Sequence, residues 1–158
     1  MRYYRTMLAY FGTVNISKVT NNSSMVHLEL LNLDTSKLTI TSNLFGYCTQ
    51  ISEIDLSKFN TCSVKDMSYM FVGCTSLVHL DLSSFDTHTV ESMYGMFCYC
   101  RSLKSLDLSS FVISDTTDTG LMFHRCESLR QVILPKDKVS SEIIINQLKK
   151  DDIVCKTK

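Results

Sequence analysis

A 26-residue period runs through most of this chain. The segment MFVGCTSLVHLDLSSFDTHTVESMYG, residues 70–95, is followed by MFCYCRSLKSLDLSSF from Met96, and a worn copy begins near Met25. Columns of apolar residues keep this spacing: Phe45, Phe71, Phe97 and Phe123; Cys48, Cys74, Cys100 and Cys126; Ile51, Leu77, Leu103 and Leu129; Ile54, Leu80, Leu106 and Val132. Such a period is typical of repeat proteins, in which each unit buries its apolar side against its neighbours.

Each unit combines two shorter patterns. Apolar and polar residues alternate around Leu80 and Leu82, which predicts a half-buried strand. Equivalent strands are expected near 27–30, 53–56, 79–82, 105–108 and 131–134. Before the strand, Met67, Met70, Phe71 and Cys74 have the i, i+3, i+4, i+7 spacing of a short helix, with Asp66, Ser92 and Asp118 as N-caps. The expected fold class is an α/β solenoid of 26-residue units. One parallel sheet of about five strands would lie opposite short helices, with both ends capped.

The whole chain, residues 1–158, is expected to form one domain. Residues 1–24 are predicted to be an N-terminal cap, as a short amphipathic helix or alternatively an edge strand. Residues 25–135 hold the repeats. Residues 136–158 are predicted to be a C-terminal cap with a helix over 139–150, because a repeat stack must cover its apolar ends.

The pattern LxxLxLxxF in residues 77–85 and 103–111 resembles a leucine-rich repeat. Over residues 25–135 the full unit, MFxxCxSLxxLDLSSFDT, resembles the BspA-type leucine-rich repeat surface proteins. That resemblance implies a curved solenoid, a place at the cell surface or outside the cell, and a role in adhesion or matrix binding. Val112 and Ile113 depart from the Asp and Thr of the repeated turn. Unpaired cysteines and the lack of a clear signal peptide leave a cytoplasmic location as the alternative.

The composition argues against several classes of function. Sixteen basic and sixteen acidic residues cancel, so the charge does not favour a nucleic-acid partner. No run of 18 apolar residues predicts a membrane span. The chain has no glycine-rich phosphate loop and no HExxH motif, and its five glycines look scattered. We therefore expect neither enzyme activity nor a cofactor.

Four of the seven cysteines form one column of the repeat, Cys48, Cys74, Cys100 and Cys126, and are expected to be a ladder of buried free thiols. Neighbouring parallel strands lie about 4.8 Å apart, which is too far between equivalent Cβ atoms for a disulfide. Cys98, Cys100, His124 and Cys126 have the donor count of a structural zinc site. On a helix, however, Cys98 would project about 150° away from the core stripe. We therefore expect Cys98 and His124 at the surface and no metal.

The exposed face of the sheet is the predicted binding surface. One column on it holds His27, Glu53, His79, Ser105 and Gln131, and the next holds Glu29, Asp55, Asp81 and Asp107. The predicted ligand-binding residues are Glu29, Glu53, Asp55, His79, Asp81, Ser105, Asp107 and Gln131. The expected function is a non-catalytic protein-binding or adhesion module for a protein ligand such as a host or matrix protein. The alternative is a structural spacer within a larger surface protein.

Overall fold

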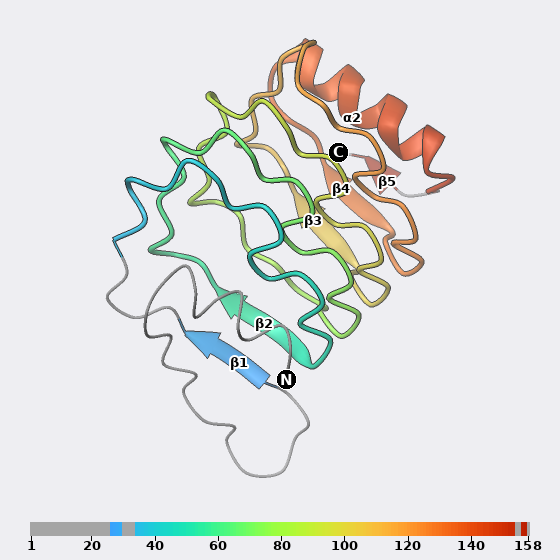
Figure 1. The fold of residues 1–158 in the computed structure, drawn as a ribbon. Helices are drawn as coiled ribbons and strands as arrows, with labels where there is room; N and C mark the ends of the chain where they lie inside the picture. Colours follow the sequence, from blue (N-terminus) through green and yellow to red (C-terminus); the bar gives the residue numbers. More distant parts are fainter. Residues whose placement is uncertain (1–25, 30–33, 154–155, 158) are drawn as a thin grey trace.

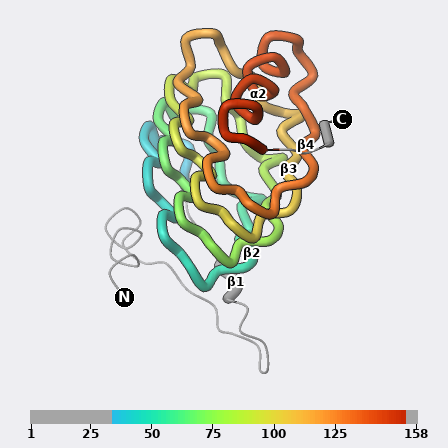
Figure 2. The backbone as a smooth tube through the Cα atoms, turned by 90° about the vertical axis from the view of Figure 1, so that its right-hand side faces the viewer, coloured from blue at the N-terminus to red at the C-terminus, as the bar shows by residue number. Residues whose placement is uncertain are grey.

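The computed structural model describes residues 26–29, 34–153 and 156–157 (Figure 1). Its elements are β1 (Val26–Glu29), β2 (Ile51–Asp55), β3 (Ser105–Asp107), β4 (Gln131–Ile133), α2 (Lys138–Lys150) and β5 (Lys156–Thr157). Between β2 and β4 the chain winds into successive 26-residue coils that lie one behind the next (Figure 2). Residues 26 apart are therefore neighbours in space.

The strands form two separate parallel sheets. One contains β1 and β2, and the other has the order β3, β4, β5. Residues 79–82, where the sequence predicts a strand, form none. Between the two sheets, the Val78 N–H donates to Ser52 O at 3.2 Å and the Lys104 N–H donates to Val78 O at 3.4 Å. The predicted α/β solenoid with one parallel sheet of about five strands is therefore wrong.

The short helices predicted opposite the strands are also wrong, since α2 is the only helix in the described part of the chain. Four segments, 41–48, 67–74, 93–100 and 119–126, consist of consecutive turns and are called here the turn segments. Each contains two residues with positive φ, in columns 26 apart: Asn43, Tyr69, Gly95 and Leu121, then Tyr47, Gly73, Tyr99 and Arg125. A right-handed helix cannot accommodate such residues.

Hydrogen bonds explain why the sequence pattern was misleading. Within a turn segment, the Met70 N–H donates to Met67 O at 3.2 Å, and the Cys74 N–H donates to Phe71 O at 3.2 Å. Turns closed over three residues give the same apolar spacing as a short helix. The intervening N–H groups donate instead to the next coil, as from Tyr69 to Tyr94 O at 2.8 Å. Backbone groups that a helix would pair internally are thus paired between coils. The predicted N-caps Asp66, Ser92 and Asp118 form isolated parallel bridges with one another.

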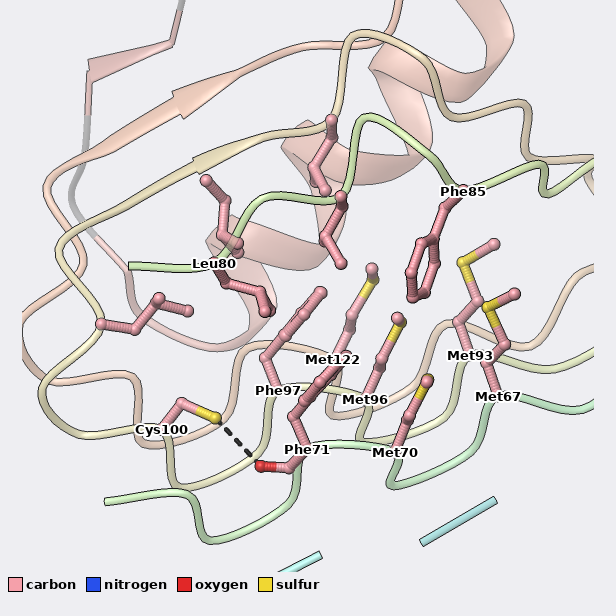
Figure 3. Close-up of a cluster of buried hydrophobic side chains, with 14 of the residues drawn as sticks. Met67, Met70, Phe71, Leu80, Phe85, Met93, Met96, Phe97, Cys100 and Met122 are labelled. Atoms are coloured by element: carbon pink, nitrogen blue, oxygen red, sulfur yellow. Dashed lines mark hydrogen bonds between the residues drawn. The ribbon is translucent and has the colours of Figure 1, made fainter. Parts of the chain in front are cut away.

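The core lies between the strand side and the turn segments (Figure 3). Leu80 points into it from the strand side, while Phe71 and Phe97 point into it from the turn segments. The rings of Phe45, Phe71, Phe97 and Phe123 stack along the coils with centroid separations of 5.4, 5.9 and 6.0 Å. The prediction that the phenylalanine column is buried is therefore confirmed.

The cysteine column is buried beside these rings. The thiols of Cys74, Cys100 and Cys126 donate to the carbonyl oxygens of Phe45, Phe71 and Phe97 at 3.0, 3.1 and 3.0 Å. Figure 3 shows the bond from Cys100. The predicted buried free thiols are confirmed for Cys48, Cys74, Cys100 and Cys126.

The prediction that Cys98 lies at the surface is wrong, because Cys98 is only 4% exposed. That prediction assumed a rotation of 100° per residue, and the turn segment does not have helical geometry. His124 is half-buried, with its ring edge-on to Tyr99 at 5.7 Å between centroids.

Native alkylation followed by mass spectrometry should show two classes of thiol. Cys62 is exposed and should react quickly. Cys48, Cys74, Cys98, Cys100 and Cys126 should react only on unfolding, because they are buried. Burial also raises the pKa of Cys48 to about 11, and that of Cys126 to about 12, so little reactive thiolate forms at neutral pH. Rapid labelling of Cys74 or Cys100 in the folded protein would contradict this assignment. Cys155 lies outside the described residues.

The helix predicted over 139–150 is confirmed as α2, which begins after the N-cap Asp137. The helix closes the end of the stack through Ser140. In the preceding coils, buried Thr61 and Thr87 each bond through Oγ1 to the N–H and C=O of the next coil. Ile113 stands where the next threonine would be, and Ser140 Oγ accepts from its N–H at 2.7 Å and donates to its C=O at 3.2 Å.

A second contact closes the same end at the turn segments. The Phe123 N–H, which would point to a further coil, donates to Asp151 Oδ2 at 3.0 Å. The departure of residues 112–113 from the repeat therefore has a structural reason: the coil there meets α2 and not another coil. The predicted N-terminal cap, residues 1–24, lies outside the described residues.

Candidate binding faces

The predicted binding residues occupy the strand side of the coils, called here the sheet face. Glu53 and Asp55 are exposed on β2, and Ser105 and Asp107 are exposed on β3. Gln131, on β4, is half-buried and pairs in register with Ser105.

The remaining predicted residues are His79 and Asp81, in the coil between the two sheets, and Glu29, on β1. His79 and Asp81 are exposed, and they belong to the stretch without a strand. The backbone of Glu29 pairs with Asp55. For His27 and Glu29 the structure describes the backbone alone. The column of acids is thus continuous in position from β2 to β3, although the sheet is not.

Each acid of this column is fixed by a local turn. Oδ1 of Asp55, Asp81 and Asp107 accepts the N–H of the serine two residues later, Ser57, Ser83 and Ser109, at 3.0, 2.9 and 2.9 Å. Short polar side chains commonly bond their own backbone in this way. This role was not predicted from the sequence, although the repeated Asp-x-Ser of residues 55–57, 81–83 and 107–109 indicates it.

The bonds from Ser83 also keep Asp81 charged. Hydrogen bonds from Ser83 lower the pKa of Asp81 and outweigh the opposing effects of burial and of the nearby Asp55 carboxylate. Asp81 and Asp107 have no ion pair within the described residues, whereas Lys65 and Glu91, elsewhere on the surface, form one at 3.0 Å. The sheet face therefore presents a row of negative groups held in place.

The outer side of the turn segments, called here the turn face, has a different chemistry. The rings of Tyr47, Tyr69 and Tyr94 each lie over the glycine 26 residues further on. A Cβ added at Gly73, Gly95 or Gly120 would lie 2.6, 2.5 or 2.7 Å from the corresponding tyrosine ring, too close for any real side chain. The three glycines are therefore not scattered. Their signal in the sequence is a tyrosine at position i and a glycine at i+26.

A cavity lined by charged residues lies beside the C-terminal end of α2. Its volume is about 840 Å³, and its charged lining residues are Arg125, Glu127, Arg130, Lys150, Asp151 and Asp152. Glu127 lies 4.0 Å from Arg125 and 3.9 Å from Arg101, while Arg130 donates to the carbonyl oxygens of Glu127 and Leu129. Its three basic and three acidic residues cancel, so the cavity selects no charged ligand.

The described residues contain neither a metal-binding cluster nor a membrane-spanning helix. No group of three or more His, Cys, Asp or Glu side chains there could hold a metal ion. Two of the four residues that have the donor count of a zinc site, Cys100 and Cys126, donate their thiols to carbonyl oxygens in the core. The helix in the described part of the chain, α2, is not long and apolar enough to cross a bilayer.

Comparison with known proteins gives one match. A family model described as "Mycoplasma protein of unknown function, DUF285" matches residues 14–136, which are 123 of the 158 residues. The comparisons with curated proteins and with solved structures find no match. The match names no leucine-rich repeat protein, so the resemblance to BspA-type surface proteins stays a prediction.

Proposed function

The chain belongs to the family described as Mycoplasma protein of unknown function, DUF285, and from that premise we propose that it is a non-catalytic protein-binding module. The sheet face is its binding surface, and the partner is a protein that presents lysine and arginine side chains. Adhesion at a cell surface is the setting that the resemblance to BspA-type proteins implies.

The row formed by Asp55, Asp81 and Asp107 carries this proposal. The three carboxylates are exposed, and each is oriented by a bond to the following serine N–H. Residues 26 apart are neighbours in the stacked coils, and the nearby Asp55 carboxylate acts to raise the pKa of Asp81, as repulsion between neighbouring like charges does. A partner's cationic groups would relieve this repulsion without rearranging the row, so little ordering is needed on binding.

Two other ligands fit the row less well. A nucleic acid carries phosphates that the acids would repel. Calcium takes six to eight oxygens around one centre, whereas this row offers carboxylates along a line. The buried thiols favour a non-catalytic role, because burial raises the pKa of Cys74 and Cys100 and so suppresses the nucleophilic thiolate.

Replacing Asp81 and Asp107 together with asparagine should weaken binding and leave the fold intact. Asparagine keeps the Oδ1 acceptor for Ser83 and Ser109, so only the charge is lost. An exposed ion pair contributes about 0.2 to 1 kcal/mol, so we expect a two- to about thirtyfold loss of affinity. Biolayer interferometry against an arginine-rich peptide and a panel of matrix proteins measures this, with binding of the unchanged chain weakening as salt rises.

The matched control is Asp34→Asn with Asp86→Asn. These exposed acids also accept an N–H two residues later, from Ser36 and His88 at 3.0 Å each, but they lie in another column. The control should bind as the unchanged chain does. Equal affinities for both double variants, or no binding to any probe, would refute the proposal and favour the structural spacer.

A further inference from the structure

We propose that the turn face is a self-association surface through which two copies of this chain pack back to back. The four turn segments, TSNLFGYC, MSYMFVGC, MYGMFCYC and TGLMFHRC, contain no aspartate, glutamate or lysine, and Arg125 is their one arginine. They hold four of the seven tyrosines and four of the five glycines. Tyr47, Tyr99 and Leu121 remain 48%, 39% and 39% exposed on this face.

This composition is that of a protein interface. The centres of such interfaces are depleted of charge and enriched in tyrosine and arginine, which also dominate binding energies. Tyrosine rings add large contact areas at a low entropic cost. Here the rings are already placed, since each of three lies on a glycine and the rings of Tyr69 and Tyr94 pack edge to face at 5.4 Å. Nucleic acids and anionic membranes need clusters of lysine and arginine, which this face lacks.

The charges at the two edges of the face select a second copy as the occupant. Asp66 and Asp118 lie at the edge where the turn segments begin. Arg125, and Arg101 with its partner Glu127, lie at the edge where the segments end. One edge thus carries two negative charges and the other a net single positive charge.

A two-fold axis parallel to the stacking direction places each edge against the opposite edge of the other copy. Asp118 of one copy then faces Arg125 of the other, because both flank the same turn segment. The central tyrosines of the two copies meet between the edges.

The face is also large enough. Twelve positions of the turn segments are exposed or half-buried, and the two flanking columns add eight, which makes twenty. A stable interface uses about 20 to 30 residues a side. A dimer of this kind leaves both sheet faces outward. If the proposed function is right, the pair would be bivalent and would bind a multivalent partner with avidity.

Sedimentation equilibrium of the full chain tests the proposal. We expect a species of twice the 18.0 kDa chain mass at micromolar concentration. Tyr99→Glu with Leu121→Glu puts charge at the centre of the face and should raise the dissociation constant at least about a hundredfold. The matched control, Val112→Glu with Val139→Glu, changes two apolar residues that are 37% and 54% exposed and lie away from this face, and it should remain dimeric.

A charge reversal tests the pairing of the edges. Arg125→Glu would face Asp118 of the second copy and should weaken the dimer about tenfold or more, while the far-UV circular dichroism spectrum stays unchanged. A monomeric unchanged chain, a dimer that persists in the Tyr99 and Leu121 variant, or an unaltered dissociation constant for Arg125→Glu would each overturn the proposal. Peptide binding tests the proposed function independently of the dimer. A monomeric variant should bind the arginine-rich peptide as strongly per chain as the unchanged protein does.

Discussion

Replacing Phe97 with alanine should lower the free energy of unfolding by about 3 to 5 kcal/mol, which is the usual cost of removing a buried phenylalanine ring. Phe97 is fully buried. Its ring is stacked between those of Phe71 and Phe123, at 5.9 and 6.0 Å and within 10° of parallel. Both neighbouring coils would lose their contact with the ring, and their backbone bonds to the central coil hold them apart, so the cavity cannot close.

Urea denaturation followed by circular dichroism measures this loss. Lys104→Ala is the control, because Lys104 is exposed and only its backbone is bonded, to Val78 and Arg130. It should change the free energy of unfolding by less than about 0.5 kcal/mol. Phe97→Leu should fall between the two, because it fills part of the cavity. Equal unfolding midpoints for Phe97→Ala and Lys104→Ala would contradict the assignment of Phe97 to the core.

Raising the pH above about 9 should destabilise the protein steeply. Burial raises the pKa of all four column thiols above that of an unfolded thiol, about 8.5. The unfolded chain therefore loses these protons first, so the stabilisation is complete below about pH 8.5 and is lost as the pH rises. Each thiol contributes about 1.4 kcal/mol per pH unit in that range. Four together give about 5 kcal/mol per unit, comparable with the whole stability of many domains.

Melting temperatures between pH 7 and pH 10.5 measure this effect. Cys100→Ser removes one ionisable group and keeps a donor for Phe71 O, so it should reduce the alkaline slope by about a quarter. Cys62→Ser changes an exposed thiol and should leave the slope unchanged. If the two variants lose stability in parallel with the unchanged protein, the buried thiols are not the cause.

The period of the sequence was enough to predict which side chains are buried. Phe71, Cys74 and Leu80 lie inside because a column that repeats every 26 residues stacks on itself whatever the local backbone does. The helix at 138–150 was also predictable, since its apolar spacing follows the end of the repeat. The acidic column was predictable in position but not in its turn chemistry, because alternation of polar and apolar residues indicates which side chains face outward and not which backbone N–H a carboxylate accepts.

Only the tertiary structure decided the conformation of residues 67–74. The spacing of Met67, Met70, Phe71 and Cys74 fits both a helix and consecutive turns, and the choice depends on where alternate N–H groups find acceptors. Those acceptors lie one coil away, as Tyr94 O does for Tyr69, so no local pattern contains them. The burial of Cys98 and the tyrosine rings on glycines follow from the same fact. Residues 26 apart become neighbours only when the coils stack, and their contacts then override local propensity.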